Sequence, residues 1–431
     1  MKKTSDKKKK DDSKNKLKDK FDLLALAGKF GALFNPTPQK EKVLRHEDFN
    51  AAGDTYYASV SVGYKIIERI LIIVLVIFLV VSLISNFSLI TYDNFFYLLK
   101  DFSTAVDIES SNYDTLSYSS NSRHFFSLYR EGLVMANPSN ISVYTATGRR
   151  TLQATSQFSS PCVMSSNKYF LVYDTAGTSF AVYNSFSRVY AETLDYPVTD
   201  ACFANDGKIA ITTRDLSSRS LVHIYDDNFK RLFTVPSNKF AFDIAMSSES
   251  NSMAICYYDI GNGSGMTQID IRRLSDMDRI ETITVDGEFL LQCGYLSSDY
   301  FAIITDRSVR IYDKYFEEID VYEYVNAQIS GFCINEYGAA VSYTENSKNY
   351  AVAFDSGGKL VFDELTDTAV NDIGIYEGFI FMRTDLGVKR VDYKASHHQF
   401  LTSGQGKMLL YSADTVLICG ESKAEYLVFE E

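Results

Sequence analysis

The sequence predicts an all-β domain outside the cell that is held to a membrane by one helix. Three observations support this prediction. Residues 70–90 form an apolar run of 21 residues without a charge. From about residue 104, short strand-like segments alternate with turn residues every eight to twelve positions, and a pattern recurs with a period near 40 residues. With 14% aromatic residues and no Trp, the chain has the composition of a sheet protein with a large core.

The N-terminal segment is basic and of low complexity. Residues 1–20 hold ten Lys and four Asp, so we expect a disordered cytoplasmic tail that is attracted to an anionic membrane surface. Residues 21–66 follow as an amphipathic segment and a polar linker. The apolar side chains of residues 21–34 fall on one broad helical face, which predicts contact with the inner leaflet or with a cytoplasmic partner. A local helix without a function is the alternative.

Residues 67–90 are predicted to be a transmembrane signal-anchor helix. The apolar run approaches the ~20 residues that cross a bilayer and is too long for a cleaved signal peptide, and no small-residue cleavage site follows it. A buried helix is the other alternative. Positive charge precedes the run, and Lys100 is the one cation in the thirty residues after it, so the N-terminus is expected in the cytoplasm. Residues 91–103 then form a juxtamembrane segment, and residues 104–431 lie outside.

The outer region is acidic. The chain carries −12 in total, residues 1–20 carry +6 and residues 21–90 are neutral, so residues 91–431 carry −18. Phosphate binding requires concentrated Lys and Arg. We therefore expect no nucleic-acid partner.

The internal repeat is clearest at one strand end and the turn after it. The five clear copies are VYTATGRR from Val143, VYNSFSRV from Val182, IYDDNFKR from Ile224, IYDKYFEE from Ile311 and AFDSGGKL from Ala353. The aromatic positions are 39, 42, 87 and 42 residues apart, and the gap of 87 contains one divergent copy. Such a turn is typical of the connection between the two outer strands of a β-propeller blade.

Extending the repeat predicts a β-propeller of eight blades, with seven as the alternative. The first strands are expected near Arg123, Ser160, Thr199, Phe242, Phe289, Ile329, Val370 and Lys407. Three strands are found in the last blade, and residues 104–120 precede the first. We expect this N-terminal segment to supply the missing outer strand and to close the ring.

These repeats resemble those of WD-type and quinoprotein-type propellers, in which a Trp-Asp or Tyr-Asp pair and a Gly-containing turn end the third strand. Trp and the accompanying Gly-His pair are absent here. The layout of a Lys-rich tail, one anchor and a diverged propeller also resembles a family of membrane-anchored propeller proteins from Firmicutes. That resemblance implies no particular activity.

The sequence indicates no cofactor and no metal site. The cysteines are Cys162, Cys202, Cys256, Cys293, Cys333 and Cys419. Four of them fall at one position of the first strand in different blades, where another blade has Ala245, so we interpret them as buried free thiols and not as disulfides. No C-x-x-C, nucleophile elbow, P-loop or calcium-loop motif is present.

One acidic pattern follows the blades. The hairpin after the second strand carries an acid in seven of them, and these acids form the candidate binding ring: Asp174, Asp215, Asp259, Asp306, Glu345, Asp385 and Glu421. Ordinary turn chemistry of Asp is one interpretation. The other is a negative surface that attracts a cation, a basic peptide or an amino-sugar polymer.

We therefore expect a non-catalytic binding or scaffolding module of the cell envelope, with a membrane partner and an envelope protein or polymer as ligand. A transmembrane receptor that signals through the N-terminal tail is the alternative. An enzyme is the least favoured class, because propeller quinoproteins and sialidases use Trp-containing motifs and the chain has no Trp.

Overall fold

The computed structural model describes residues 67–81, 115–118, 123–247, 249, 251–261, 264–395 and 397–430. The chain divides into two units, Met1–Leu89 and Ile90–Glu431. In the first unit, residues 67–81 are helical and every side chain of the helix is exposed. Within the described ranges, no helix combines the length and hydrophobicity needed to cross a membrane. The segment expected to be cytoplasmic (1–66), the end of the expected anchor (82–90) and the expected juxtamembrane segment (91–103) lie outside the described residues.

The second unit contains eight four-stranded antiparallel sheets, as the eight-blade prediction requires, and the seven-blade alternative is wrong. Within blades 1 to 7, the four strands follow one another in chain order from the inside outward. Blade 1 has β2 (Phe125–Tyr129), β3 (Gly132–Ala136), β4 (Asn140–Tyr144) and β5 (Arg150–Thr155); blade 2 has β6 (Pro161–Ser165), β7 (Phe170–Asp174), β8 (Ser179–Tyr183) and β9 (Arg188–Thr193); blade 3 has β10 (Val198–Phe203), β11 (Ile209–Asp215), β12 (Arg219–Tyr225) and β13 (Arg231–Ser237); blade 4 has β14 (Phe240–Ser247), β15 (Ser252–Gly261), β16 (Ser264–Arg273) and β17 (Arg279–Asp286).

Blades 5 to 8 continue the same order. Blade 5 has β18 (Leu290–Tyr295), β19 (Tyr300–Thr305), β20 (Ser308–Asp313) and β21 (Glu318–Glu323); blade 6 has β22 (Gln328–Asn335), β23 (Gly338–Glu345), β24 (Lys348–Asp355) and β25 (Leu360–Thr366); blade 7 has β26 (Asp372–Tyr376), β27 (Phe379–Arg383), β28 (Gly387–Asp392) and β29 (His397–Thr402); blade 8 has β30 (Lys407–Leu410), β31 (Thr415–Cys419), β32 (Lys423–Val428) and the closing strand β1 (Thr115–Ser117). Each predicted blade start lies within two residues of an observed first strand.

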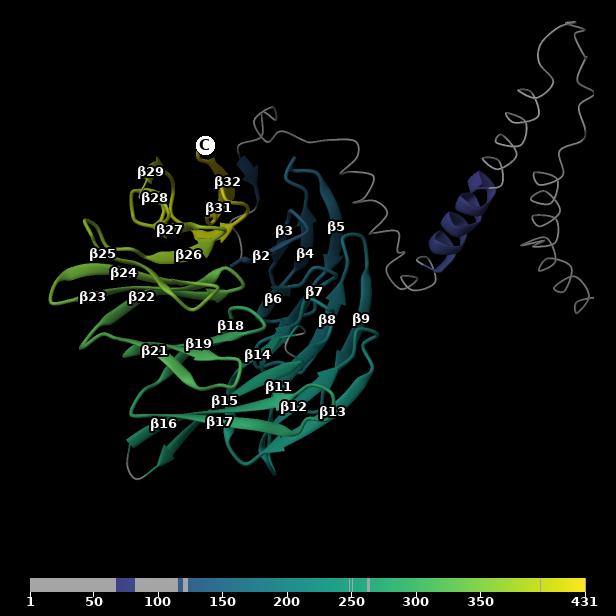
Figure 1. Ribbon diagram of the computed structural model, residues 1–431, viewed down its shortest axis with the longest axis horizontal. Coiled ribbons are helices and arrows are strands. Elements are labelled where there is room, and N and C mark those ends of the chain that lie inside the picture. Colours follow the sequence, from purple (N-terminus) through teal and green to yellow (C-terminus); the bar gives the residue numbers. More distant parts are fainter. Residues whose placement is uncertain are drawn as a thin grey trace, which may run out of the picture. The chain divides into compact units, whose positions relative to one another are not determined.

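Blade 8 is completed by a strand from the other end of the propeller, as predicted. Its sheet has the order β1-β32-β31-β30, and Leu116 of β1 lies opposite Ala424 of β32. The Tyr118 hydroxyl also donates a hydrogen bond to the Gly420 carbonyl at 2.6 Å. Figure 1 shows the blades following one another in chain order until the yellow blade 8 lies beside the blue blade 1. The outer edge of β32 is thus paired instead of exposed.

The repeated turn has a clear physical cause. After the buried aromatic residue, Asp226, Asp313 and Asp355 each accept hydrogen bonds from backbone N–H groups two and four residues later, at 2.7–3.0 Å. Three residues after the Asp, the backbone has a positive φ, which is +64° at Phe229 and +73° at Gly358. Each turn follows a bulge at the end of the third strand. The Asp side chain therefore fixes the connection between the two outer strands.

The core lies between neighbouring blades. One cluster, for example, joins Val309 and Ile311 of blade 5 to Val341 and Phe354 of blade 6. The innermost strands of successive blades contact one another all round, including β2 with β30. This packing closes the ring and leaves the first strands lining a central channel.

Candidate functional site

The seven acids of the candidate binding ring all lie at the hairpin between the second and third strands of a blade, in blades 2 to 8. We call the side of the propeller with these hairpins the hairpin face. The same face carries the starts of the first strands, because the N–H of Phe289 donates to Asp306 Oδ1 and that of Ser160 to Asp174 Oδ1, both at 2.7 Å.

Several ring acids have partners within their own blade. Asp174 is buried against the start of its first strand. Asp215 accepts hydrogen bonds from Ser217 and Ser218, which hold the pKa of its carboxyl below the ordinary value. Asp259 pairs with Lys239 at 3.4 Å. Turn chemistry therefore accounts for part of the acidic pattern, and the exposed members are Asp385 and Glu421.

Asp385 accepts a hydrogen bond from the Asn371 amide at 2.6 Å. Glu345 lies opposite Lys348 in its hairpin. The ring is not uniformly negative, since exposed cations such as Arg307 and Lys423 stand in the same hairpins.

Exposed apolar side chains share the hairpin face with the acids. Leu216 and Leu386 follow Asp215 and Asp385 directly and are 95% and 65% exposed. Val325, before the first strand of blade 6, is 63% exposed. Phe240 and Phe289, at the starts of blades 4 and 5, are also exposed. Apolar tips beside carboxylates on five consecutive blades form a surface suited to a protein partner.

A cavity of about 800 Å³ opens at the junction of blades 8, 1 and 2. We call it the mouth pocket. Its walls include the polar side chains Arg123, His124, Lys407 and Glu421 together with the ring of Phe125. The Lys407 ammonium donates to the Phe126 carbonyl at 3.2 Å and so bridges the closing blade to blade 1. Glu421 is the ring acid that the structure places at this cavity.

The central channel is a second cavity, of about 690 Å³, lined by first strands of all eight blades. Val163 borders both the channel and the mouth pocket. Cys202 and Cys333 lie half-buried on the channel wall. Both residues lie near the axis, as predicted, but they are half-buried and line the channel instead of the packed core. No disulfide is present among the described residues.

Neighbouring blades are linked through side chains of the first strands that accept hydrogen bonds from the backbone of the next first strand. Asp200 Oδ2 accepts from Ile244 N at 3.2 Å, and Asp243 Oδ2 accepts from Cys293 N at 3.0 Å. The same relation joins blades 5 and 6, where Gln292 Oε1 accepts from Ile334 N at 3.1 Å. Asp372 Oδ2 accepts from the N–H of Met408 in blade 8 at 3.3 Å. We call these four side chains the inter-blade acceptors.

Burial raises the pKa of the carboxylic acids among these acceptors. The pKa of Asp200 rises to about 8, first through burial and then through the charge of Asp243. Burial likewise raises the pKa of Asp243 and of Asp372. At neutral pH, Asp200 therefore carries its proton for much of the time, and the contact between blades 3 and 4 is less negative than its composition implies.

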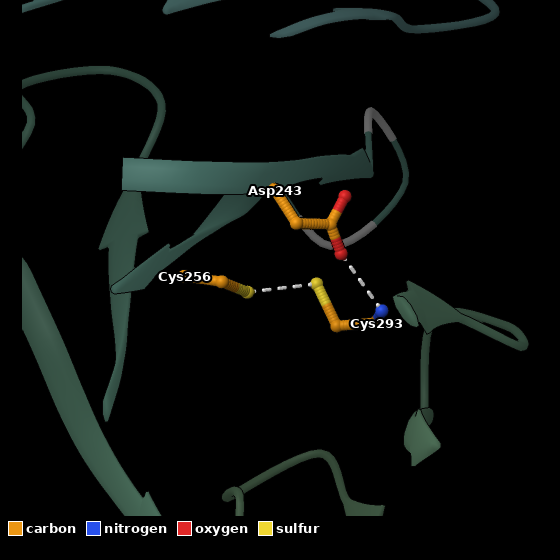
Figure 2. A group of neighbouring side chains, drawn as sticks. All are labelled: Asp243, Cys256 and Cys293. Carbon is orange, nitrogen blue, oxygen red and sulfur yellow. Dashed lines mark hydrogen bonds between the residues drawn. The ribbon is translucent and has the colours of Figure 1, made fainter. Parts of the chain in front are cut away.

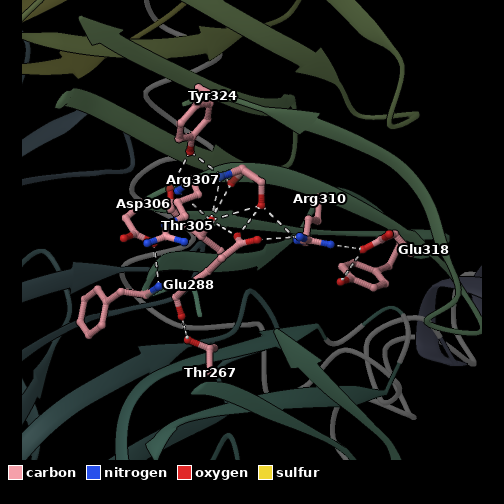
Figure 3. Close-up of polar contacts among 11 residues, drawn as sticks. Thr267, Glu288, Thr305, Asp306, Arg307, Arg310, Glu318 and Tyr324 are labelled. Atoms are coloured by element: carbon pink, nitrogen blue, oxygen red, sulfur yellow. Dashed lines mark hydrogen bonds and ion pairs between the residues drawn. The ribbon is translucent and has the colours of Figure 1, made fainter. Parts of the chain in front are cut away.

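A polar network stabilises the hairpin face at blade 5 (Figure 3). Glu288 accepts hydrogen bonds from Thr305 and Ser308 and pairs with Arg310 at 2.7 Å. Burial acts to raise the pKa of Glu288, but these hydrogen bonds and the Arg310 charge outweigh it, so the pKa is lowered. The Tyr324 hydroxyl donates to the Thr305 carbonyl at 2.6 Å. Beside this network, Asp306 lines a cavity of about 520 Å³.

Sequence reasoning missed the inter-blade acceptors. A usable signal was present, because Asp200, Asp243 and Asp372 each lie in a first strand and directly precede two small or apolar residues. It also missed the approach of Cys256 to Cys293 beside Asp243, which brings three ligand atoms within 4.8 Å. Those cysteines come from different blades and from different strand positions.

Comparison with known proteins agrees with this fold. A family model described as "Family of unknown function (DUF5711)" matches residues 106–409. No curated protein has significant sequence similarity to the chain.

Among solved structures, Sqt1 from Saccharomyces cerevisiae is similar with a TM-score of 0.57 at 8% identity, covering 74% of this chain and 98% of Sqt1. The Dos1 propeller gives 0.52 at 11% identity, covering 75% and 96%. BamB from Moraxella catarrhalis gives 0.50 at 9% identity, covering 74% and 99%. At these identities the likeness establishes the propeller fold alone.

Proposed function

The chain belongs to the family of unknown function DUF5711, and from its propeller fold and the charge and hydropathy pattern of its sequence we propose that it is a non-catalytic binding or scaffolding module of the cell envelope. Residues 67–90 anchor it in the membrane, residues 1–66 lie in the cytoplasm, and the propeller lies outside. The charge distribution along the sequence and the apolar run at 70–90 support this orientation.

One observation carries the binding proposal: the hairpin face combines exposed apolar tips with carboxylates. Leu216, Phe240, Phe289, Val325 and Leu386 extend across five blades. A few well-packed, fully buried contacts contribute most of the affinity of protein interfaces, whereas peripheral charges contribute specificity and association rate. The partner is accordingly an envelope protein with an apolar segment flanked by Lys or Arg.

In this proposal the exposed acids of the candidate binding ring attract the partner electrostatically. Asp385 and Glu421 are exposed, and Glu421 stands at the mouth pocket. Their charge attracts a basic segment over several ångströms and is screened by salt. The acids with partners in their own blade, such as Asp174 and Asp215, shape the hairpins that present the face.

The test is site-specific photocrosslinking in cells with the full-length protein. A photoreactive residue is placed at position 216, 325 or 386 on the hairpin face. Positions 232 and 319 serve as matched controls, because Leu232 and Ile319 are exposed apolar residues on the outermost strands. We expect one defined envelope protein to crosslink from the hairpin-face positions and not from the controls.

Equal crosslinking from both sets of positions, or from neither, contradicts the proposal. Crosslinks to a glycan alone would identify a polymer ligand instead of a protein. A cytoplasmic protein captured through residues 21–34 in a manner that depends on the outer partner would favour the receptor alternative.

A further inference from the structure

Cys256 and Cys293 meet across the boundary between blades 4 and 5. Cys256 lies in the second strand of blade 4 and Cys293 in the first strand of blade 5, and their Sγ atoms are 3.1 Å apart. Both residues are buried, with 0% and 5% exposure. Figure 2 shows the two sulfurs pointing toward each other. A movement of about 1 Å would bring them to the ~2.05 Å of a disulfide bond.

The backbone near this pair is held in place by Asp243. The Cys293 N–H donates to Asp243 Oδ2 at 3.0 Å, which ties the first strand of blade 5 to that of blade 4 beside the two sulfurs. The hydrogen bond fixes the strand that carries one thiol relative to the blade that carries the other. The sulfurs are therefore brought together by the packing of the blades and not by a flexible loop.

A metal fits this group less well than a bond between the sulfurs. The Asp243 oxygen and the two sulfurs lie within 4.8 Å of one another, so the group offers three ligands. Structural zinc takes four ligands, and tetrahedral Zn–S bonds of ~2.3 Å hold two thiolates about 3.8 Å apart. The observed separation of 3.1 Å is too short for that arrangement.

We propose that Cys256 and Cys293 form a disulfide that joins blade 4 to blade 5. The oxidant is a small-molecule or protein disulfide. The thiolate of one cysteine attacks it and forms a mixed disulfide, releasing one thiol. The second cysteine then attacks the protein sulfur of the mixed disulfide and releases the second thiol. Two protein thiols are oxidised and one external disulfide is reduced to two thiols. Disulfides persist in oxidising compartments and are rare in the cytosol, so in the cell this inference rests on the proposed outer location of the propeller.

The burial of the two thiols determines at which step of folding the disulfide can form. Burial raises the pKa of Cys256 to about 11. Hydrogen bonding with Cys256 and burial raise the pKa of Cys293 well above its ordinary value. Because the thiolate is the reactive species, the packed pair reacts slowly with an external disulfide. The bond therefore forms while blade 5 is docking on blade 4, when the oxidant still has access.

The test is a cysteine map of the full-length protein folded with a mixture of reduced and oxidised glutathione. The folded protein is unfolded in the presence of an alkylating agent, digested and analysed by mass spectrometry. We expect a linked pair of peptides containing Cys256 and Cys293, about 2 Da lighter than the two thiol peptides. Cys162, Cys202, Cys333 and Cys419 are expected to be alkylated. This measurement needs no variant and so remains decisive if substitutions impair folding.

Thermal unfolding gives an independent readout. Reductant should lower the melting temperature of the wild type and of Cys333→Ala, which removes a channel-wall thiol. It should leave the Cys256→Ala/Cys293→Ala variant unchanged. Alkylation of both Cys256 and Cys293 in the glutathione-treated protein would overturn the proposal. So would one bound Zn²⁺ that protects both thiols from alkylation while no linked peptide forms.

Discussion

Leu116 lies opposite Ala424 in the ladder that completes the last blade, so a three-residue strand closes a ring of eight blades. The N–H of Tyr118 donates to the Ser422 carbonyl at 2.8 Å, and bonded pairs alternate along an antiparallel ladder. Leu116 therefore occupies a hydrogen-bonded pair. Its side chain also packs against the cluster of buried residues between blade 8 and blade 1.

Leu116→Pro should destabilise the propeller by about 1–3 kcal/mol, because it removes a ladder hydrogen bond and part of this packing. It should also promote aggregation through the unpaired edge of β32. Denaturant unfolding and light scattering measure the two effects. Leu116→Val keeps the backbone donor and should stay close to wild type. Equal stability of the Pro and Val variants would show that the closing strand contributes nothing.

Asp200→Asn should flatten the pH dependence of stability. The pKa of Asp200 is about 8 in the folded protein and ~3.9 when unfolded, so the folded state binds more protons between these values. Its stabilising contribution is complete below pH ~4 and is lost as pH rises toward 8. Wild type should lose about 1–3 kcal/mol relative to Asp200→Asn between pH 5 and 7. The Asn oxygen can still accept the Ile244 N–H.

Unfolding midpoints measured across this pH range check the prediction. Asp195→Asn, which changes an exposed carboxylate in the nearby connection between blades 2 and 3, serves as the control and should follow the wild-type curve. Parallel curves for wild type and Asp200→Asn would mean that the Asp200 carboxyl titrates as it does in water.

Glu288→Gln should cost about 2 kcal/mol at pH 7, since it removes the charge that pairs with Arg310 and receives two hydroxyl hydrogen bonds. The pKa of Glu288 is lowered, so this contribution is present above ~4.3, the unfolded pKa, and disappears as pH falls further. The difference between variant and wild type should therefore shrink at pH 3. Glu364→Gln, on an exposed outer strand, should have no effect at either pH.

Val76→Lys should impair membrane integration, because a Lys at the centre of a spanning helix costs roughly 2.5–3.5 kcal/mol. Carbonate extraction of cell membranes measures the integrated fraction. Glu68→Lys changes charge at the start of the same apolar segment and should remain integrated. Release of the wild-type protein from the membranes by carbonate would contradict the prediction that residues 67–90 are a transmembrane anchor.

Asp385→Asn/Glu421→Gln should slow association with the captured partner several-fold at low ionic strength. The effect should vanish at about 0.5 M salt, because screening then shortens the range of these charges. Surface binding kinetics at two salt concentrations provide the measurement. Asp320→Asn/Glu364→Gln removes the same charge from the outermost strands and should not alter the rate. A salt-independent loss in the first variant would point to direct contact instead of steering.

The sequence predicted the blade boundaries because five of the eight blades repeat one clear local pattern. An aromatic residue and an Asp-centred turn, as at Tyr225 and Asp226, end the third strand wherever they occur. The closing strand was predictable because the sequence of blade 8 contains only three strands, which left the place of the outermost strand empty.

Contacts between blades could not be predicted from the repeat. The hydrogen bond from Cys293 to Asp243 and the approach of Cys256 to Cys293 depend on how far one sheet is rotated against the next. A periodic pattern fixes the pairing within a sheet, but it carries no information about that lateral alignment. The partners of the ring acids could not be predicted for a similar reason. The N–H that donates to Asp174 belongs to Ser160, which lies in the connection between blades 1 and 2.

The closing strand also sets an order of events during synthesis. Tyr118 and Gly420, which bond across the closed blade, are 302 residues apart in the sequence. The early strand must therefore wait, unpaired, until nearly the whole propeller has left the ribosome. A chain cut short before β32 would leave β31 with a bare sheet edge and β1 without a partner, and exposed edges of this kind are recognised by chaperones and proteases. Completion of blade 8 thus acts as a check on completeness, because only the finished molecule can pair β1 with β32.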